Sequence, residues 1–535
     1  MGSASALTLM RCGLGKKVQK KPNILFIMSD DHAYQAISAY DDKLIQTPNI
    51  DRLAKEGMKF TNGCVTNSIC APSRATILTG KHCHKHGKID NKFPFDDTQT
   101  TFPQIMQENG YTTAMYGKLH FGNNPKGVDD FMILPGQGNY INPDFITKDG
   151  RVHKEGYCTD IITDLTIEWL DKKRDKTKPF MMMYLHKAPH RPWWPRADKM
   201  AEFVNKKFPE PPTLFDDYEN RGTAAKTAEM NLLKHMKYGH DSKIYPEVQK
   251  EMGTDLKPYV PPAMWGGIDG FSGPYNRATE EQKAEYKPTL NKINKDFKDN
   301  WPTMTDEEKM RWKYQRYMQD YLACISSVDD NVGRVLDYLD ESGLADNTIV
   351  IYTSDQGFYL GEHGWFDKRF IYDESFKTPL LMRWPGKVKP GSVCDEMVQN
   401  LDFAQTMLNV AGIEEPEDMQ GESLLPLLKG KTDEWTRDAV YYHYYEYPAV
   451  HMVKRHYGIV TTDYKLAHFY YDVDEWELYD RKKDTYEINN VYDDPAYADV
   501  VKDLKVRLET LRKKYGDSKE LDQKYLKQYL EKIDA

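Results

Sequence analysis

The sequence predicts an α/β fold: a sheet covered by helices on both faces, followed by a smaller antiparallel sheet and a closing helix. From Lys21 onward, short apolar runs typical of buried strands alternate with amphipathic stretches typical of helices. Each of the main strand candidates is followed at once by polar or ionisable residues. After Lys429-Gly430 the composition shifts to tyrosine-rich alternating segments, which favour antiparallel strands.

The first strand is NILFIM at residues 23–28, which is apolar throughout and therefore predicted to be buried. Thr47-Pro48 then supplies an N-cap and a first-turn proline for a helix that ends at Gly57. A strand is predicted at 59–65. The remaining candidates for the large sheet are residues 111–116, 180–185, 348–353 and 378–382.

A charged region rich in lysine and proline, at residues 196–311, departs from this alternation. We interpret it as a helical insertion beside the core that helps to shape a substrate entrance. A long helix from about residue 312 to a stop at Gly343 leads back to the sheet, and an amphipathic helix is predicted at 499–533. The chain thus divides into a leader or tail at 1–20, a main domain at 21–430 and a C-terminal subdomain at 431–535.

Composition excludes several classes of protein. The chain has 73 Lys and Arg against 82 Asp and Glu, a net charge of −9 without a basic block, which argues against nucleic-acid binding. No apolar run is long enough to span a membrane. The seven cysteines form no CxxC pair, so neither a disulfide framework nor a thiolate zinc site is indicated.

The N-terminus joins a short apolar run, residues 6–10, to Cys12 and a lysine-rich stretch. This arrangement resembles the remnant of a bacterial export leader, with Cys12 as a possible lipid attachment site, although Arg11 suits such a site poorly. A flexible tail is the alternative. An exported protein, periplasmic or at the cell surface, is expected.

Acidic residues follow two of the predicted strands. Asp30 and Asp31 come directly after the first strand, and Asp355 and Gln356 follow the strand at 348–353. In open α/β sheets, ligands bind outside the carboxyl ends of the strands, and adjacent carboxylates repel one another unless a cation intervenes. Three carboxylates and an amide oxygen suit Ca²⁺, or less readily Mg²⁺, and do not suit zinc.

The most specific motif is CAPSR at residues 70–74, followed by ATILTGKHCHKHG. With this motif the chain resembles the sulfatase family, whose signature is Cys or Ser-x-Pro-Ser-Arg with a downstream Thr-Gly. Matching blocks follow in order from Pro22 to about Val491. The resemblance implies the alkaline-phosphatase-like α/β fold, with a large mixed sheet flanked by helices, and makes residues 21–430 the catalytic domain.

The resemblance also implies that a formylglycine-generating maturation enzyme converts Cys70 to formylglycine. The hydrated aldehyde carries two hydroxyls on one carbon. One can attack sulfur, and the other can later expel sulfate by collapsing to the carbonyl. An unmodified, buried Cys70 is the alternative.

The family's site residues map onto this sequence block by block. Its metal ligands correspond to Asp30, Asp31, Asp355 and Gln356, completed by the oxygen at position 70; Gln356 departs from the commoner Asn or His. The other site residues are Arg74, Lys118, His120, His190 and Lys368. Arg74, Lys118 and Lys368 would offset negative charge on a sulfate ester. His190 would protonate the leaving alcohol, and His120 would serve the formylglycine hydroxyl.

The implied reaction is hydrolysis of a sulfate ester on a carbohydrate. Several blocks resemble carbohydrate sulfatases of gut Bacteroides, in particular those acting on the 6-O-sulfate of N-acetylglucosamine in heparan-type glycosaminoglycans. An iduronate-2-sulfatase or other carbohydrate sulfatase is the alternative within the family. Outside it stand a phosphatase or phosphodiesterase, which would need more histidine ligands, and a non-catalytic glycan-binding protein.

Several other residues have two interpretations. Trp194, with Trp193, could line a sugar site or belong to the core. Arg369 could contact the glycan or pair with Asp373, four residues on. His186 is expected to be structural, and the cluster of His82, Cys83, His84 and His86 is expected to pack at a helix end rather than to bind zinc.

Overall fold

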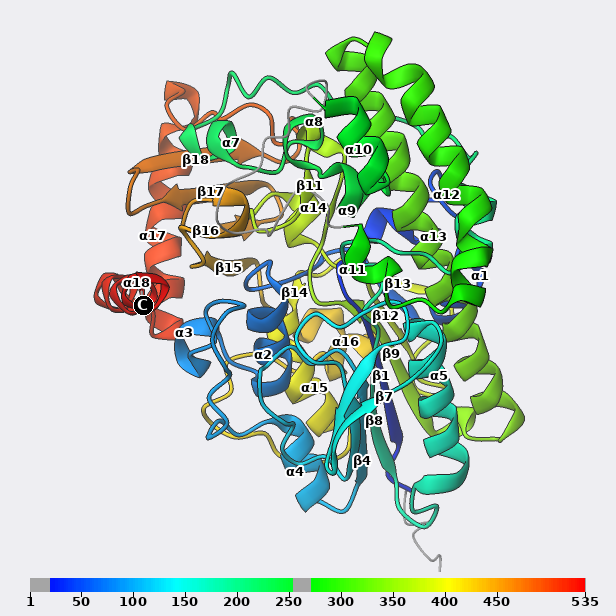
Figure 1. Ribbon diagram of the computed structural model, residues 1–535. Coiled ribbons are helices and arrows are strands. Elements are labelled where there is room, and N and C mark those ends of the chain that lie inside the picture. The colour runs from blue at the N-terminus through cyan, green and yellow to red at the C-terminus, as the bar shows by residue number, and fades with distance from the viewer. Residues whose placement is uncertain (1–19, 254–270, 535) are drawn as a thin grey trace, which may run out of the picture.

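The computed structural model describes residues 20–253 and 271–534. Ten strands form one large sheet in the order β13-β2-β12-β9-β1-β8-β4-β5-β6-β7 (Figure 1). Their bounds, in that order, are Ser392–Cys394, Met58–Phe60, Leu380–Arg383, Thr348–Ser354, Asn23–Ser29, Phe180–Leu185, Thr112–Gly117, Asp130–Ile133, Asp144–Thr147 and Gly150–His153. The central strands are parallel and β12 is antiparallel to its neighbours, so the predicted mixed sheet is confirmed.

Both faces of the sheet are buried under helices, which explains why its central strands are apolar along most of their length. Leu25 and Ile27 of β1 face one core, together with α1 (Pro48–Lys55), α5 (Cys158–Glu168) and α13 (Asp306–Glu341). Ile24 and Phe26 face the other core, with α2 (Cys70–Thr79), α4 (Phe102–Glu108), α15 (Phe403–Val410) and α16 (Leu425–Leu428). The fold therefore has three layers, with the middle of the sheet as its interior.

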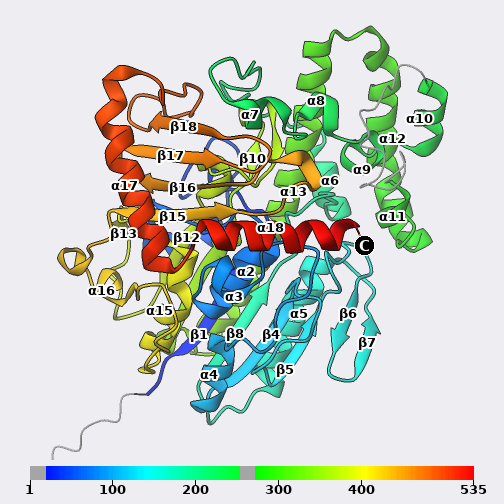
Figure 2. The same cartoon turned by 90° about the vertical axis from the view of Figure 1, so that its left-hand side faces the viewer.

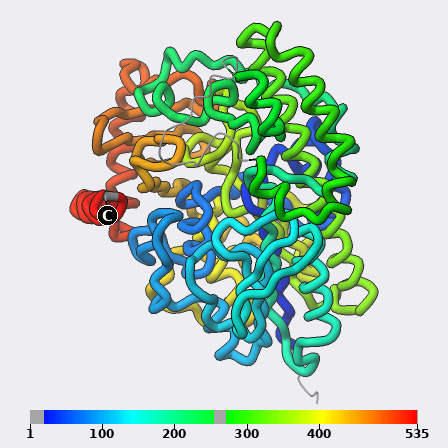
Figure 3. Tube along the Cα trace, viewed as in Figure 1, coloured from blue at the N-terminus to red at the C-terminus, as the bar shows by residue number. Residues whose placement is uncertain are grey.

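The region predicted as an insertion consists mainly of helices outside the sheet. Several of them pack against α13, and Figure 3 shows this part of the chain on the outer side of the molecule. The helices are α6 (Ala197–Phe203), α7 (Thr223–Thr227), α8 (Leu232–His235), α9 (Tyr238–Ser242), α10 (Pro246–Met252), α11 (Ser272–Tyr275) and α12 (Glu280–Asn300). The long helix α13 begins earlier than predicted, because Thr305 and Glu308 form a capping box at its N-terminus.

The C-terminal subdomain holds a four-stranded antiparallel sheet in the order β15-β16-β17-β18, as predicted. Its strands are Ala439–Tyr444, His456–Thr461, Tyr464–Phe469 and Glu475–Asp480. The single closing helix predicted at 499–533 is wrong. The chain forms α17 (Ala498–Tyr515) and α18 (Lys519–Asp534), and α18 turns across the direction of α17 (Figure 2). Gly516, with φ 70°, ends α17 in the left-handed conformation.

Three further differences concern short strands. The strand predicted at 59–65 is divided between β2 in the large sheet and β3 (Gly63–Cys64), which pairs with β14 (Val398–Gln399). Strands β5, β6 and β7 were not predicted, and β7 is exposed along its whole length, so it lacks the apolar pattern of a buried strand. A third small sheet pairs β10 (Tyr359–Leu360) with β11 (Phe366–Asp367). Among the described residues, none of the helices has the length and apolar character needed to cross a membrane.

Candidate active site

The strand register brings the two acidic strand ends together. Strands β1 and β9 are parallel neighbours, and Ser29 pairs with Ser354 at their carboxyl ends. The next residues of both strands, starting with Asp30 and Asp355, therefore leave the sheet side by side. The backbone N–H of Asp31 donates to Asp355 Oδ1 over 3.1 Å, and φ of Asp31 is 66°, so the chain turns sharply at this point.

Three carboxylates meet at this edge, each with an oxygen within 4.8 Å of the others and each fully buried: Asp30, Asp31 and Asp355. A different cationic side chain contacts each of them. Lys118 Nζ bonds to Asp30, Arg74 Nε lies 2.8 Å from Asp355 Oδ2, and Lys368 Nζ lies 2.6 Å from Asp31 Oδ1. The charges are thus balanced locally, as buried ionised groups require.

The same charges set the pKa values of the carboxyls. Burial raises the pKa of Asp31 to about 6, against the opposing charge of Lys368. Burial, together with the charge of Asp30, raises the pKa of Asp355 to about 7. Burial would also raise the pKa of Asp30, but the adjacent Lys118, His190 and Arg74 hold it well below its usual range.

The donor set fits a hard cation. Asp30 Oδ1 and Gln356 Oε1 are buried and have no hydrogen-bond partner among the described residues. Gln356 Nε2 donates to Asp31 Oδ1 over 2.5 Å and to Asp355 Oδ1 over 2.8 Å, so the amide occupies the point on which the carboxylate oxygens converge. The atoms here that could bind a cation are carboxylate and amide oxygens. These are the ligands that Ca²⁺ and Mg²⁺ take.

Cys70 is the first residue of α2 and is fully buried beside the carboxylates. Its Sγ belongs to a group, with Asp30 and His190, whose ligand atoms lie within 4.8 Å of one another, and Gln356 Nε2 lies 3.8 Å from it. Burial, and next the charge of Asp30, raises the pKa of the Cys70 thiol well above its usual value. A plain thiol at this position is therefore held protonated and is a poor nucleophile.

Lys118 and His120 follow β4, the second neighbour of β1 in the sheet. Lys118 is fully buried and its Nζ also contacts Gln137 Oε1. His120 has φ 67°, and its buried Nδ1 has no hydrogen-bond partner among the described residues. Burial, and then the neighbouring Lys118, lowers the pKa of His120 well below its usual value, so this imidazole is neutral.

His190 lies on the other side of the carboxylates. Its Nε2 is 3.7 Å from Asp31 Oδ2, and its Nδ1 lies 2.6 Å from the carbonyl oxygen of Arg191. A carbonyl can only accept, so Nδ1 carries a hydrogen and Nε2 is the nitrogen that faces the site. Burial, and next Lys118, lowers the pKa of His190 in the structure without an anionic ligand.

The predicted sugar contact at Trp194 does not fit the structure. Trp194 is fully buried, and its ring lies 5.6 Å from that of Phe271 and 5.9 Å from that of Tyr286. Trp193 is fully buried as well, against Tyr317. The pair belongs to the core because each indole is enclosed by aromatic side chains, and neither offers a face to a ligand.

One of the two interpretations of Arg369, an ion pair with Asp373, does not fit the structure. Arg369 has φ 98°, so the two residues do not lie on successive turns of one helix. Its guanidinium instead lies 3.2 Å from Asp367 and 3.5 Å from Glu446, while Asp373 pairs with Lys377, Lys465 and Arg481. Contact between Arg369 and a glycan stays a prediction.

The dense histidine segment forms packing contacts, as expected. The His82 ring lies 4.3 Å from the ring of Tyr515, and His84 Nε2 lies 2.9 Å from the Tyr515 carbonyl oxygen. His82 is the N-cap of α3 (Cys83–His86), which contains the other three residues and is separate from α2. His186 is fully buried against the ring of Tyr184.

Three polar side chains at the site escaped sequence reasoning. Ser73 Oγ donates to the carbonyl of Asp355, Asn91 Oδ1 accepts from the N–H of Ala71 over 2.9 Å, and Gln137 contacts Lys118. Ser73 lies inside the CAPSR motif, so that motif could have identified it. Asn91 and Gln137 are single residues in loops, and nothing in their neighbourhood along the chain marks them.

Known proteins share this fold over almost the whole chain. The protein resembles a phosphonate monoester hydrolase from Silicibacter pomeroyi at 20% identity, with a TM-score of 0.64 over 92% of this chain and 96% of the other, a likeness in fold alone. The Sulfatase family model matches residues 22–413, and a model described as N-sulphoglucosamine sulphohydrolase, C-terminal, matches 361–514. The chain belongs to the sulfatase family and is a sulfuric ester hydrolase.

Two more specific likenesses stand out. An N-acetylglucosamine-6-O-sulfatase from Bacteroides thetaiotaomicron is 46% identical over 520 residues, which cover 96% of this chain and 90% of that protein. A solved structure described as a complex with its substrate D-glucosamine-2-N,6-O-disulfate is also 46% identical, with a TM-score of 0.87 over 94% of this chain and all of the other. The human N-acetylglucosamine-6-sulfatase is 26% identical over 79% of this chain and 67% of its own length.

Proposed function

We propose that the protein removes the 6-O-sulfate from N-acetylglucosamine in heparan-type glycosaminoglycan fragments. The observation that carries the proposal is 46% identity, over nearly the full length of both chains, to a sulfatase named for this reaction. The likeness to a protein bound to a 6-O-sulfated glucosamine supports the same choice. The buried group of carboxylates, cations and Cys70 supports sulfate-ester chemistry at this position.

The proposed nucleophile is a hydrated formylglycine formed from Cys70. One hydroxyl oxygen would attack sulfur and lose its proton to solvent, and the bond from sulfur to the sugar oxygen would break. The sugar alcohol would take a proton from His190, which would regain one from solvent. The second hydroxyl then loses its proton to His120 and collapses to the aldehyde, which breaks the carbon–oxygen bond and frees sulfate. Water adds to the aldehyde and restores the hydrate. The raised pKa of the Cys70 thiol supports a nucleophile other than thiolate.

The proposed sulfate-binding groups are Arg74, Lys118 and Lys368. All three are buried, so their charges act through little screening water. They are already fixed by Asp355, Asp30 and Asp31, respectively, and need little reorganisation when the ester enters. A bound anionic ester would also raise the pKa of the adjacent His190 imidazole and favour its protonated form.

The proposed cofactor is one Ca²⁺, with Mg²⁺ as the less suitable ion. Asp30, Asp31, Asp355 and Gln356 would hold it, with the Gln356 amide turned so that its oxygen faces the ion. A divalent cation there would offset the repulsion among the carboxylates and polarise the oxygen attached at position 70. Asp30 Oδ1 and Gln356 Oε1, which accept no hydrogen bond from the described residues, support this assignment.

The first experiment is a peptide-mass measurement across residues 69–74, in protein made with a formylglycine-generating maturation enzyme. A mass that corresponds to replacement of the thiol by an aldehyde is expected. An unmodified cysteine in protein that still releases sulfate would exclude the mechanism. An unmodified cysteine in protein that binds glycan without turnover would favour the non-catalytic alternative.

The second experiment compares 6-sulfated N-acetylglucosamine with a 2-sulfated uronic acid disaccharide. We expect preference for the first by more than about tenfold in kcat/KM, equivalent to roughly 1.4 kcal/mol of differential transition-state binding. Preference of that size for the uronic acid would replace the proposed substrate with that of an iduronate-2-sulfatase and leave the sulfatase assignment intact.

The proposed location is outside the cytoplasm of a bacterium, periplasmic or at the cell surface. Cys12, the possible lipid attachment site, lies outside the described residues. Fractionation of cells that express the full chain, compared with a Cys12→Ser variant, tests both points. Release of the variant from the membrane fraction would support lipidation, and equal partition of the two proteins would exclude it.

A further inference from the structure

The segment from His190 to Pro195 is held by buried side chains at five of its six residues. Four backbone carbonyls accept a hydrogen bond from a distant side chain, and the guanidinium of Arg191 forms an ion pair. The donors to the carbonyls of His190, Pro192, Trp194 and Pro195 are Tyr140, Lys243, Tyr157 and Tyr286, at 2.6, 2.7, 3.2 and 2.9 Å, and the partner of Arg191 is Asp241. We call this segment the His190 loop.

Three of these five contacts come from the insertion. Asp241 of α9 binds Arg191 through both carboxylate oxygens, with Nε at 2.6 Å from Oδ1 and Nη2 at 2.5 Å from Oδ2. Lys243 directly follows α9, and its Nζ also lies 3.1 Å from Asp320 of α13. Tyr286 lies on α12. Asp241 and Lys243 are fully buried and Arg191 is 7% exposed, so the charges are strong, poorly screened anchors.

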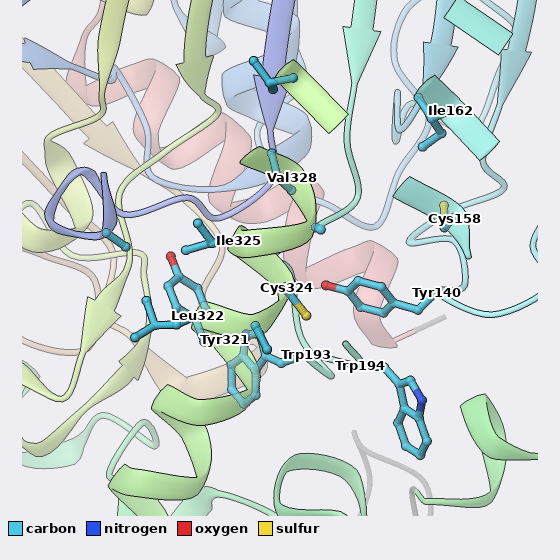
Figure 4. Close-up of a cluster of buried hydrophobic side chains, with 14 of the residues drawn as sticks. Tyr140, Cys158, Ile162, Trp193, Trp194, Tyr321, Leu322, Cys324, Ile325 and Val328 are labelled. Atoms are coloured by element: carbon cyan, nitrogen blue, oxygen red, sulfur yellow. The ribbon is translucent and has the colours of Figure 1, made fainter. Parts of the chain in front are cut away.

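The other two contacts come from the main domain. Tyr140 is 1% exposed, and its own carbonyl accepts from the N–H of Cys158, at the start of α5. Figure 4 shows Tyr140 and the two buried tryptophans of the His190 loop, Trp193 and Trp194, near Cys324 of α13. The loop is therefore fixed between α13, the core tyrosines and the insertion, and only His190 at its beginning reaches the carboxylates.

We propose that the insertion positions His190, the proton donor of the proposed reaction, through the Arg191–Asp241 pair and the carbonyl contacts of Lys243 and Tyr286. Tyr140 completes this set of positioning residues from the core side. The inference rests on the proposed role of His190. It assigns a purpose to the charged region at 196–311 that differs from the expected shaping of a substrate entrance.

The physical reason is the geometry of proton transfer. His190 Nε2 must meet the leaving oxygen within hydrogen-bond reach, and a displacement of about 1 Å is enough to cost about 100-fold in rate. The Nδ1 contact to the Arg191 carbonyl fixes the ring only if that peptide is itself fixed. Asp241 holds the side chain of the same residue, so loss of the pair would free both the peptide and the imidazole.

The test is a double-mutant cycle with Asp241→Asn and His190→Ala on 6-sulfated N-acetylglucosamine. If Asp241 acts through His190, Asp241→Asn lowers kcat by about tenfold or more with KM nearly unchanged, and has little further effect once His190 is alanine. An equal loss of kcat in both backgrounds, or no loss in either, would overturn the proposal. Tyr245→Phe is the matched control, because Tyr245 lies in the insertion and its hydroxyl donates to the exposed Asn291 rather than to the His190 loop.

A second variant keeps the test decisive if Asp241→Asn does not fold, since it leaves a buried arginine unpaired. Tyr286→Phe removes one hydroxyl of the insertion, the donor to the Pro195 carbonyl, and should show the same dependence on His190 with a smaller loss of kcat. The proposed function fails in a different way. If His190→Ala alone leaves kcat unchanged, His190 is not the proton donor. If His190→Ala is severe and both positioning variants are silent, only the role of the insertion is lost.

Discussion

Within the part of the chain that the structure describes, buried groups with the spacing of a metal site lie in two places. One is the active-site group of Asp30, Asp31 and Asp355, and the other is formed by His443, Asp517 and Asp522 in the C-terminal subdomain. Burial raises the pKa of Asp355 and of Asp522 alike to about 7, and in each case a neighbouring aspartate adds to the effect. The two clusters nevertheless have different surroundings.

The C-terminal cluster joins elements of structure. His443 of β15 lies 2.9 Å from Asp517, between α17 and α18, and Asp522 of α18 lies 2.6 Å from Arg512 of α17. Tyr441 and Tyr470 contribute further hydrogen bonds, so only Asp522 Oδ1 lacks a partner there among the described residues. The active-site cluster instead faces Cys70 and three cations that can also bind an anion. Carboxylate spacing alone therefore does not identify a catalytic site, whereas spacing next to a nucleophile at a sheet edge does.

The strongest way to test this contrast is to remove the nucleophile. Cys70→Ala should abolish sulfate release, because no oxygen remains at this position to attack sulfur. Fold and calcium binding should persist, since the carboxylates and Gln356 are untouched. Sulfate assays and thermal melting measure both, and turnover above a small fraction of the starting enzyme would refute the covalent mechanism.

The dependence of activity on a metal ion should also distinguish the two clusters. Exhaustive chelation should remove most activity, with calcium and not zinc restoring it, because the ligands are oxygens. Asp355→Asn and Asp522→Asn form a matched pair, since each removes one charge from a buried aspartate. Titration calorimetry with Ca²⁺ should show lost or weakened binding only for the first, and the reverse result would place the cation in the C-terminal subdomain.

Folding stability, in contrast to activity, should depend on the C-terminal cluster. His443→Ala leaves the buried Asp517 without one of its hydrogen-bond donors and opens a cavity between β15 and α18, at a cost of about 1–3 kcal/mol. The variant should keep the kcat of the starting enzyme. Denaturant melts combined with sulfate assays measure both quantities, and a large loss of kcat at unchanged stability would give this cluster a role in catalysis.

The smallest expected effect is a dependence of folding stability on pH. The folded-state pKa of Asp522, about 7, exceeds its ordinary value of 3.8, so the folded protein binds this proton more tightly than the unfolded chain does. The stability that this group contributes is full below about pH 4 and is lost as the pH rises through about 7. Asp522→Asn should remove this slope. Melting temperatures of the two proteins across this range should therefore diverge, and parallel curves would contradict the assignment.

The sequence alone predicted the elements and residues that a local pattern along the chain marks. The apolar runs of β1 and β9, with acidic residues directly after them, predicted both the sheet and the carboxylate site. The break at Gly516 was missed because the amphipathic pattern continues through it into α18. The choice for Trp194 between a sugar site and the core stayed open, because an aromatic residue near a site motif has the same local sequence whether it faces solvent or, as here, Tyr286. The pair of Arg191 with Asp241 joins residues 50 positions apart, a proximity that only the folded chain shows.

The pairing of Ser29 with Ser354 has a consequence beyond the site it builds. The proposed calcium ligands come in equal numbers from the two strands, so a shift of one residue between β1 and β9 would move one pair along the edge and turn its side chains to the opposite face. Affinity for the proposed calcium ion would therefore report whether β1 and β9 have formed their native register at the centre of the sheet. During refolding, recovery of calcium binding would time the moment at which these two strands, more than 300 residues apart, come into alignment.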